Sequence, residues 1–477
     1  MSMPTVRLKA DAPGAGVRIL AVLLLVLVVS GFGRTVAAQE MAGDLDPGIV
    51  KLVSAVSEER LGAILKQLER FETRSTLSST TSTTRGIGAA RQWILDEMKS
   101  YSPKLQVSFD SYPVVAQGRI TRNVELRNVM AILPGRSPRR IYVSGHYDTV
   151  ARPGGQGAAN AAGPPRDPDA PAPRAADPSA PLDNLAPGVN DDGSGTALTI
   201  ELARIFSQSG IDFDATLVFM CHVGEEQGLV GARLHAQKAV AEKIPIEAIL
   251  NNDIVGNDRG GNGIVDGATI RVYSEGPEDS PSRELARFVQ RWGGRYVPSH
   301  KVRPMARPDR FGRGGDHSAY NGLGFTAVGF RESRENFTRQ HDVRDTYEGI
   351  SLPYLAQNAR VNAAAAATLA LAPPPPGVLS DRNQPMITRA PSGYDANLKW
   401  TAVPGASAYR IFWREAWGPD WQHEMLVGNV TNVVLPNMQI DDFVFGVAAA
   451  DAHGHESFVT AYVTPPRAST PIKTAGQ

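Results

Sequence analysis

The chain has 477 residues, of which 42% are hydrophobic and 21% are charged, and this length predicts more than one domain. Its 49 basic and 49 acidic residues balance, which disfavours both a nucleic-acid-binding protein with a basic surface and a strongly acidic disordered protein. The single cysteine, Cys221, excludes a disulfide framework and any metal site built from several cysteines, so a bound metal would need histidine and carboxylate ligands.

Residues 1–38 have the pattern of an export signal. Arg7, Lys9 and Arg18 precede an apolar run over residues 19–29, and small residues follow it up to residue 38. This run is shorter than the roughly 20 apolar residues that a membrane-spanning helix needs, which disfavours the alternative of a membrane anchor. We therefore expect a secreted or periplasmic protein, with no stable membrane insertion after the signal is cleaved.

Alternating helix and strand patterns over residues 39–372 predict one large α/β domain. Apolar residues recur at helical spacing in residues 49–71, 89–101, 194–208, 229–242, 281–292 and 352–371. Strand-like runs occupy residues 128–133, 141–144, 215–223, 246–254, 269–273 and 325–330. Several of these runs are apolar throughout, as in strands that are covered on both faces. The pattern predicts a mixed, mostly parallel sheet flanked by helices.

Two stretches interrupt this pattern. Residues 151–187 consist mainly of Ala, Pro and Gly, which predicts a disordered insertion. Residues 373–379 contain four consecutive prolines and predict a stiff linker. Beyond the linker, alternating runs over residues 380–466 resemble a fibronectin type III β-sandwich with Trp400 and Tyr409 in its core. Such a module implies attachment to a surface or polymer, and residues 467–477 predict a flexible tail.

Acids and two histidines stand at the ends of predicted strands and in the loops after them. The set comprises His146, Asp148, Asp191, Asp192, Glu225, Glu226, Asp253 and His341. Functional groups gather at the carboxyl ends of strands in open α/β sheets. Each residue alone is better explained as an ordinary structural or surface residue, but an apolar strand rarely ends in two unpaired glutamates without a cation nearby. Two histidines and three carboxylates supply enough ligands for two zinc-type ions if one carboxylate bridges them.

In this order, the motifs resemble metallopeptidase family 28, the co-catalytic dizinc aminopeptidases, over residues 49–371. The resemblance implies an α/β zinc-aminopeptidase fold and two Zn²⁺ ions that share one bridging carboxylate. The implied reaction removes the N-terminal residue of a peptide with a water molecule that the metal ions activate. The implied ligands are the bridging Asp191, with His146 and Asp253 for one ion and Glu226 and His341 for the other.

The resemblance also implies roles for the neighbouring residues. Glu225 matches the general base, Asp148 matches the acid that orients a ligand histidine, and the peptide bond between Asp191 and Asp192 matches a cis bond. Gln340 stands where family members often carry a tyrosine that stabilises the oxyanion, and its amide N–H is a candidate substitute.

Several residues near these motifs have less specific interpretations. We interpret Cys221 and His222 as structural, and Asp316 and His317 as structural or substrate-side. Four loop arginines form either a solvated basic loop or a rim that attracts carboxylate-bearing substrates. They are Arg303, Arg307, Arg310 and Arg313.

Other functions remain open on the sequence alone. A dizinc carboxypeptidase or deacylase usually carries an inserted lid domain, whereas this chain has apparent core elements between Asp253 and His341. A glutaminyl cyclase-like relative typically binds one metal ion. A catalytically silent peptide-binding ectodomain would usually have lost ligands, and here the complete set is present. We therefore predict a secreted aminopeptidase that acts on peptides or small proteins and has no nucleic-acid partner.

Overall fold

The computed structural model describes residues 45–152 and 183–463. The predicted export signal, most of the predicted insertion at residues 151–187 and the predicted tail therefore lie outside the described residues. Within the described ranges, no helix has the length and apolar character that crossing a membrane requires.

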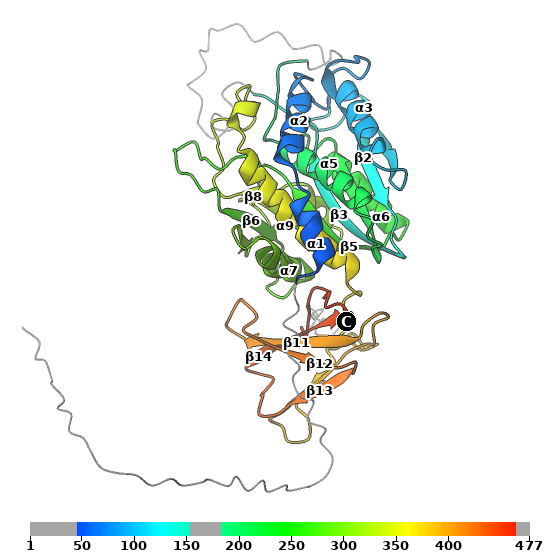
Figure 1. The fold of residues 1–477 in the computed structure, drawn as a ribbon, viewed down its shortest axis with the longest axis vertical. Helices are drawn as coiled ribbons and strands as arrows, with labels where there is room; N and C mark the ends of the chain where they lie inside the picture. The colour runs from blue at the N-terminus through cyan, green and yellow to red at the C-terminus, as the bar shows by residue number, and fades with distance from the viewer. Residues whose placement is uncertain (1–44, 153–182, 464–477) are drawn as a thin grey trace, which may run out of the picture. The chain divides into compact units, whose positions relative to one another are not determined.

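An eight-stranded mixed sheet forms the centre of the large domain (Figure 1). Its strands are β1 (Gln106–Val114), β2 (Val124–Leu133), β3 (Ser137–His146), β4 (Ala215–His222), β5 (Ile246–Asn252), β6 (Thr269–Ser274), β7 (Lys301–Met305) and β8 (Ala327–Glu332). They lie in the order β1-β2-β4-β3-β5-β8-β6-β7. The neighbours β4, β3, β5 and β8 run parallel, whereas the β1–β2, β2–β4 and β6–β8 pairs are antiparallel. The predicted mixed sheet is confirmed, and its parallel part is central.

Helices cover both faces of this sheet. One face packs against α1 (Pro47–Ser54), α2 (Glu58–Glu69), α3 (Gly86–Lys99), α5 (Gly193–Gln208), α7 (Pro281–Tyr296) and α9 (Leu352–Leu371). The other face packs against α6 (Val230–Ala241) and α8 (Asp316–Asn321). Alternation along β3 explains the two cores, because Ile141 and Val143 face the first core and Tyr142 faces the second. In Figure 1, α5 and α9 lie side by side over the sheet.

The elements differ from the sequence prediction in a few places. The helical pattern over residues 49–71 forms two helices, because Ser57 begins a new one by accepting a hydrogen bond from the Arg60 N–H at 3.2 Å. The strands β1 and β7 and the short helix α8 were not predicted. β7 has five residues and α8 has six, so neither is long enough to show a clear period.

Two small antiparallel sheets follow α9. One contains β9 (Ile387–Thr388), β10 (Ala396–Lys399) and β13 (Asn432–Leu435), in the order β13-β10-β9. The other contains β11 (Ala408–Glu415), β12 (His423–Val427), β14 (Phe443–Ala450) and β15 (Thr460–Ala461), in the order β12-β11-β14-β15. Residues of both sheets share one hydrophobic core, where the rings of Trp400 and Tyr409 lie 5.4 Å apart. The expected all-β part is present, and its assignment to the fibronectin type III class stays a prediction.

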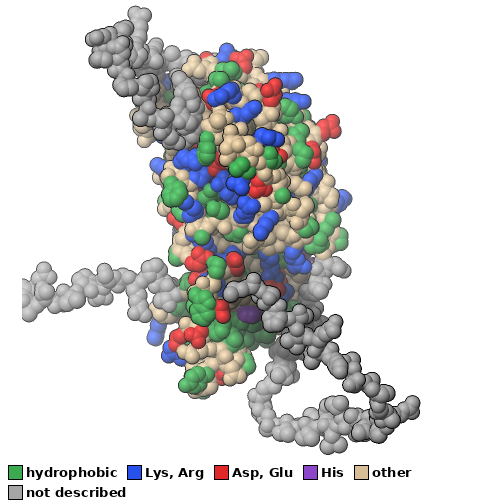
Figure 2. Space-filling model, turned by 90° about the vertical axis from the view of Figure 1, so that its left-hand side faces the viewer, with side chains coloured by type: hydrophobic (Ala, Val, Ile, Leu, Met, Phe, Trp, Pro, Cys, Tyr) green, Lys and Arg blue, Asp and Glu red, His purple; other side chains and the backbone are tan. Residues whose placement is uncertain are grey.

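Side chains of both charge signs are interspersed over the face drawn in Figure 2. This agrees with the balanced composition of 49 basic and 49 acidic residues. The balanced charge of the whole surface therefore does not indicate a function, and local clusters of charged side chains are the informative feature.

The start of α5 approaches the ends of β3 and β5 so closely that only glycine fits at positions 145 and 195. A Cβ atom on Gly195 would lie 2.2 Å from the backbone oxygen of Asn252, and one on Gly145 would lie 2.6 Å from the backbone carbon of Gly195. Gly195→Ala is therefore expected to lower the free energy of unfolding by about 1–3 kcal/mol, through overpacking. Thermal denaturation checks this expectation.

Gly294→Ala is the matched control for that substitution. A Cβ atom on Gly294, inside α7, meets no atom within 4 Å, so alanine should leave the melting temperature unchanged or raise it. Equal melting temperatures for the two variants would contradict the close approach at Gly195.

Candidate active site

The acidic and histidine residues singled out in the sequence lie at one edge of the sheet. His146 is the last residue of β3, Asp253 directly follows β5, and Glu225 lies in the bend after β4. Asp191 precedes α5, and His341 lies in the loop between β8 and η1 (Tyr347–Gly349). Because β4, β3, β5 and β8 are parallel, their carboxyl ends bring these segments together.

Asp191 lies between the two imidazole rings. Its Oδ1 atom is 3.4 Å from Nε2 of His146, and its Oδ2 atom is 3.1 Å from Nε2 of His341. Each histidine also faces a second carboxylate: Asp253 Oδ1 lies 3.7 Å from His146 Nε2, and Glu226 Oε2 lies 3.2 Å from His341 Nε2. The five predicted ligands therefore form two groups that share Asp191, which is the arrangement that a bridging carboxylate requires.

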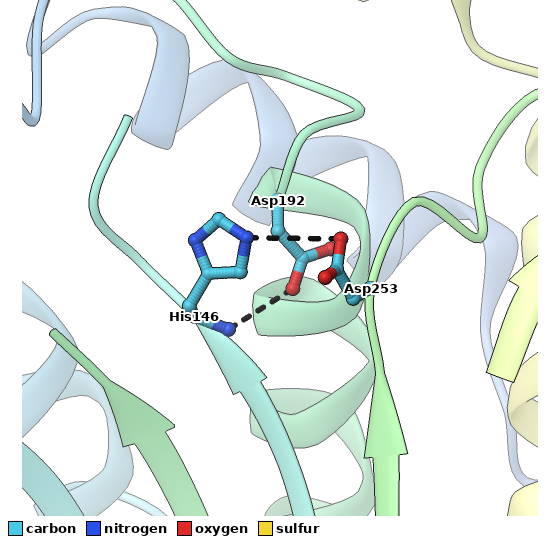
Figure 3. A group of neighbouring side chains, drawn as sticks. All are labelled: His146, Asp192 and Asp253. Carbon is cyan, nitrogen blue, oxygen red and sulfur yellow. Dashed lines mark hydrogen bonds and ion pairs between the residues drawn. The ribbon is translucent and has the colours of Figure 1, made fainter. Parts of the chain in front are cut away.

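Asp192 offers a competing arrangement. Ligand atoms of His146, Asp192 and Asp253 lie within 4.8 Å of one another (Figure 3). However, Asp192 Oδ2 accepts the backbone N–H of His146 at 3.0 Å, and Asp192 Oδ1 accepts two further backbone N–H groups at 2.9 and 3.1 Å. These bonds tie together the end of β3, the start of α5 and the chain after β5. We therefore interpret Asp192 as a residue that positions the site and Asp191 as the shared ligand. The bond between Asp191 and Asp192 is cis, as the resemblance implied.

Asp148 holds His146 and both glutamates in place. Its backbone oxygen lies 3.0 Å from His146 Nδ1, and its carboxylate accepts the backbone N–H groups of Glu225 at 3.2 Å and Glu226 at 3.3 Å. A carbonyl oxygen can only accept, so Nδ1 of His146 carries a proton and Nε2 faces Asp191. The orienting role predicted for Asp148 falls mainly on its backbone carbonyl, because its carboxylate lies farther from His146 Nδ1, at 3.6 Å.

The Arg74 side chain forms hydrogen bonds with the backbone beside this site. Its buried guanidinium donates to the backbone oxygens of Tyr147 at 2.7 Å, Pro187 at 2.7 Å and Gly188 at 2.7 Å, as well as to Leu68 at 3.1 Å. The two chain segments that flank residues 153–182 are thereby held by one side chain. Sequence analysis missed Arg74, because nothing distinguishes it from a surface arginine in the sequence.

The crowded carboxylates shift the pKa values of both histidines. Burial alone would lower the pKa of His146, but hydrogen bonds with Asp148, Asp191 and Asp253 outweigh it and raise the pKa well above its ordinary value. Burial likewise opposes protonation of His341, but Glu226 and Asp191 raise its pKa to about 11. The cluster therefore stabilises positive charge between its carboxylates, where metal ions can take the place of the histidine protons.

The donor set fits metal ions. Imidazole nitrogen and carboxylate oxygen are the ligands that zinc accepts in the absence of thiolates. Oε1 of Glu226 is buried and has no hydrogen-bond partner in the part of the chain that the structure describes. A buried carboxylate oxygen without a partner is unfavourable unless a cation compensates it.

Glu225 lies beside the predicted ligands and faces a cavity. Its side chain is 15% exposed, and its Oε2 atom is 4.0 Å from Nε2 of His146. Burial raises the pKa of Glu225 well above its ordinary value, and although the charge of His146 opposes this shift, Asp253 and Glu226 reinforce it. A carboxyl group in this position is suited to exchanging a proton with a molecule in the cavity.

Arg331, at the end of β8, is a site residue that sequence analysis missed. Its guanidinium pairs through both Nη atoms with the two carboxylate oxygens of Asp253, and it donates to the Gly314 oxygen at 2.7 Å. Burial alone would raise the pKa of Asp253, but Arg331 and His146 hold it below its ordinary value. Each oxygen of a carboxylate has two lone pairs, so Asp253 can accept from Arg331 and still face His146.

The remaining candidate residues from the sequence are Gln340, Asp316 and His317. Gln340 borders the cavity, but its Nε2 donates to Glu335 Oε2 at 3.1 Å, so one of its two N–H groups is already engaged. Asp316 and His317 are 1% and 2% exposed, which favours the structural interpretation. Burial raises the pKa of Asp316 to about 8, and neither of its oxygens has a hydrogen-bond partner among the described residues.

A cavity of about 490 Å³ opens over these groups. Asp191, Glu225, Glu226, Asp253 and His341 border it. Arg310 and Arg313 of the predicted basic loop also border it. Arg303 instead pairs with Asp266 at 3.4 Å, and Arg307 stacks on the Phe311 ring at 3.4 Å. The loop arginines are thus divided between the cavity and the outer surface.

Ligand-type side chains that meet at the ends of parallel strands, with a protonatable carboxyl beside an open cavity, are typical of metal-dependent hydrolases. The chain belongs to peptidase family M28, whose model matches residues 128–366.

Relatives agree with this assignment. A protein of Pyricularia oryzae named as a probable zinc metalloprotease is 36% identical over 472 residues, which is 90% of this chain and 86% of that protein. A protein of Pyrenophora tritici-repentis with the same name is 33% identical over 449 residues, which is 86% of each chain. Among solved structures, the LapA aminopeptidase of Legionella pneumophila matches with a TM-score of 0.50 and 18% identity, over 70% of this chain and 78% of that one. This last likeness shows a shared fold.

Proposed function

We propose that the protein is a secreted, zinc-dependent aminopeptidase that removes N-terminal residues from peptides or small proteins. The observation that carries this proposal is the position of Asp191, whose two oxygens face His146 at 3.4 Å and His341 at 3.1 Å. Zinc is supported by the names of the relatives and by the nitrogen and oxygen donor set. Removal of N-terminal residues is supported by the order of motifs, which resembles that of dizinc aminopeptidases.

The residues of the site have separate roles in the proposed hydrolysis. His146 and Asp253 would hold one ion, Glu226 and His341 the other, and Asp191 would contact both. Zinc ions bound there would polarise the scissile carbonyl and acidify a water molecule.

Glu225 acts as the proton carrier in this proposal. It takes the proton of the attacking water on its carboxylate and returns it to the leaving amine. Asp148 fixes the positions of Glu225 and His146 relative to each other, because it is hydrogen-bonded to both. Arg331 fixes the direction of the Asp253 carboxylate by pairing with both of its oxygens.

Chelation and N-terminal blocking test this proposal. Free aminoacyl anilides of several side chains should be hydrolysed, and N-acetylation should lower the rate by more than ~100-fold, because a site built around a polar group rejects the analogue that lacks it. A chelator should abolish the activity, and added zinc should restore it.

Other results of the same assay would indicate other functions. Equal hydrolysis of free and acetylated substrates would contradict an aminopeptidase and favour a carboxypeptidase or deacylase. Cyclisation of N-terminal glutamine with release of ammonia would indicate a glutaminyl cyclase-like enzyme. A lack of chelator-sensitive turnover on every substrate would favour a silent peptide-binding ectodomain. Attachment of the enzyme to a surface or polymer through the C-terminal β-sheets remains part of the proposal.

A further inference from the structure

Five arginines border the cavity, and two of them are neutralised. Arg331 is paired with Asp253. Arg310 is paired with Glu335, and it also donates to the backbone oxygens of Arg313 at 3.0 Å and Gly314 at 3.2 Å. These two guanidinium groups shape the wall of the cavity and have little capacity left for a ligand.

The other three arginines have no neutralising partner at hydrogen-bonding distance within the described ranges. Among the residues that the structure describes, Arg119 donates to the backbone oxygen of Glu226 alone, at 3.0 Å. Arg313 lies 3.9 Å from Glu335, which already pairs with Arg310 and with Arg271. The Arg152 guanidinium makes no hydrogen bond or ion pair to a residue that the structure describes. Burial lowers the pKa of Arg313, the charge of Arg310 adds to this shift, and Glu335 opposes it.

The acidic residues that border the cavity do not neutralise these three arginines. Asp191 and Glu226 face His341, Asp253 is paired with Arg331, and Glu225 lies 4.0 Å from His146 Nε2. Metal ions bound by these acids would add further positive charge. The charge that remains available to a ligand in the cavity is therefore positive, and a partly enclosed cavity strengthens its effect.

The three arginines stand on both sides of the reacting groups. Arg119 is bonded to the backbone of Glu226, and the backbone N–H of Arg152 donates to the backbone oxygen of His341 at 2.9 Å. Both arginines therefore lie beside the Glu226 and His341 half of the site. Arg313 precedes Gly314, whose oxygen is bonded to Arg331, the partner of Asp253, so it lies beside the other half. The ring of Phe337, 5.0 Å from the Arg313 guanidinium, helps to hold that side chain.

We propose that Arg119, Arg152 and Arg313 make this enzyme selective for peptides that carry a carboxylate close to the scissile bond. This inference rests on the proposed aminopeptidase function. A guanidinium group binds a carboxylate through two parallel hydrogen bonds, so it distinguishes glutamate from glutamine by charge as well as by shape. The carboxylate can belong to the first residue, to the second residue or to the C-terminus of a dipeptide.

Three pairs of peptides, each with and without one carboxylate, separate these sources. The first residue is tested by Glu-Ala-Ala-amide against Gln-Ala-Ala-amide. The second residue is tested by Ala-Glu-Ala-amide against Ala-Gln-Ala-amide. The C-terminus is tested by Ala-Ala against Ala-Ala-amide. We expect the acidic member of at least one pair to have a kcat/KM about tenfold higher, mostly through a lower KM, and raised salt to reduce this preference.

Single substitutions then identify the arginines responsible. Arg119→Gln, Arg152→Gln and Arg313→Gln should each be made, and at least one should reduce the ratio of kcat/KM between the acidic and the neutral peptide to about threefold or less. The corresponding Arg→Lys variant should restore part of the preference, because it keeps the charge. Arg303→Gln is the matched control, since it removes the same charge outside the cavity and should keep the full preference.

Two results would overturn the inference. One is equal kcat/KM within all three peptide pairs, and the other is a preference that survives all three glutamine substitutions. Hydrolysis without a carboxylate preference would refute this inference alone. Failure to hydrolyse any of the peptides would refute the proposed function together with it.

Discussion

Glu225→Gln is expected to lower kcat by at least about 1,000-fold and to leave the zinc content unchanged. Glutamine has nearly the same shape as glutamate but cannot carry the proton from water to the leaving amine. The Glu225 side chain borders the cavity, and the nearest imidazole nitrogen is 4.0 Å away, so its loss should not open the metal site. Turnover of a free aminoacyl anilide and elemental analysis of the purified protein check both parts.

Glu226→Gln is the matched control, because it makes the same chemical change one residue later. Glu226 Oε2 lies 3.2 Å from Nε2 of His341, and its Oε1 atom is buried without a partner among the described residues. This variant should lose zinc as well as activity. If Glu225→Gln lost zinc and Glu226→Gln retained it, the roles of the two glutamates would be exchanged.

Asp191→Asn is expected to have the largest effect on metal binding. Both of its oxygens face histidines, so one substitution weakens both groups of ligands. Replacing residues that only support a ligand typically costs about 10–100-fold in metal affinity, and the loss of a shared ligand should exceed ~100-fold. Titration of the chelator-treated protein with zinc measures this affinity.

Asp192→Asn should behave differently, because Asp192 is a structural acceptor in this site. It should weaken folding by about 1–3 kcal/mol, since an amide N–H would then face the His146 N–H that the carboxylate accepts. It should bind zinc far better than Asp191→Asn does. Loss of zinc from Asp192→Asn alone would show that the grouping of His146, Asp192 and Asp253 is the true metal site.

The central part of the fold was predictable because its strands are apolar throughout. β4 is buried at every position, and its run of hydrophobic residues indicated a strand covered on both faces. The 20-residue helix α9 matches the predicted range of 352–371. β1 is different, because it lies at the edge of the sheet and only two of its nine residues are buried. An edge strand has a weak hydrophobic pattern, since one of its sides has no neighbouring strand.

The site was predictable where its residues belong to motifs at strand ends. His146, Asp191 and His341 are brought together as expected, although 195 positions separate the first from the last. Arg331 could not be found in the same way, since its importance comes only from its contact with Asp253 across neighbouring strands. The basic loop could be noticed in the sequence, but only the fold shows that Arg313 borders the cavity and Arg303 does not.

Arg74 has a consequence for how this chain can vary. One buried side chain holds the backbone at Tyr147, Pro187 and Gly188, so the path of the chain on either side of residues 153–182 is set independently of what lies between. The entropy of closing a loop grows only slowly with its length once its two ends are fixed. The connection between β3 and α5 can therefore lengthen or shorten without moving His146 or Asp191. Arg74 thus makes the geometry of the site independent of the length of that connection.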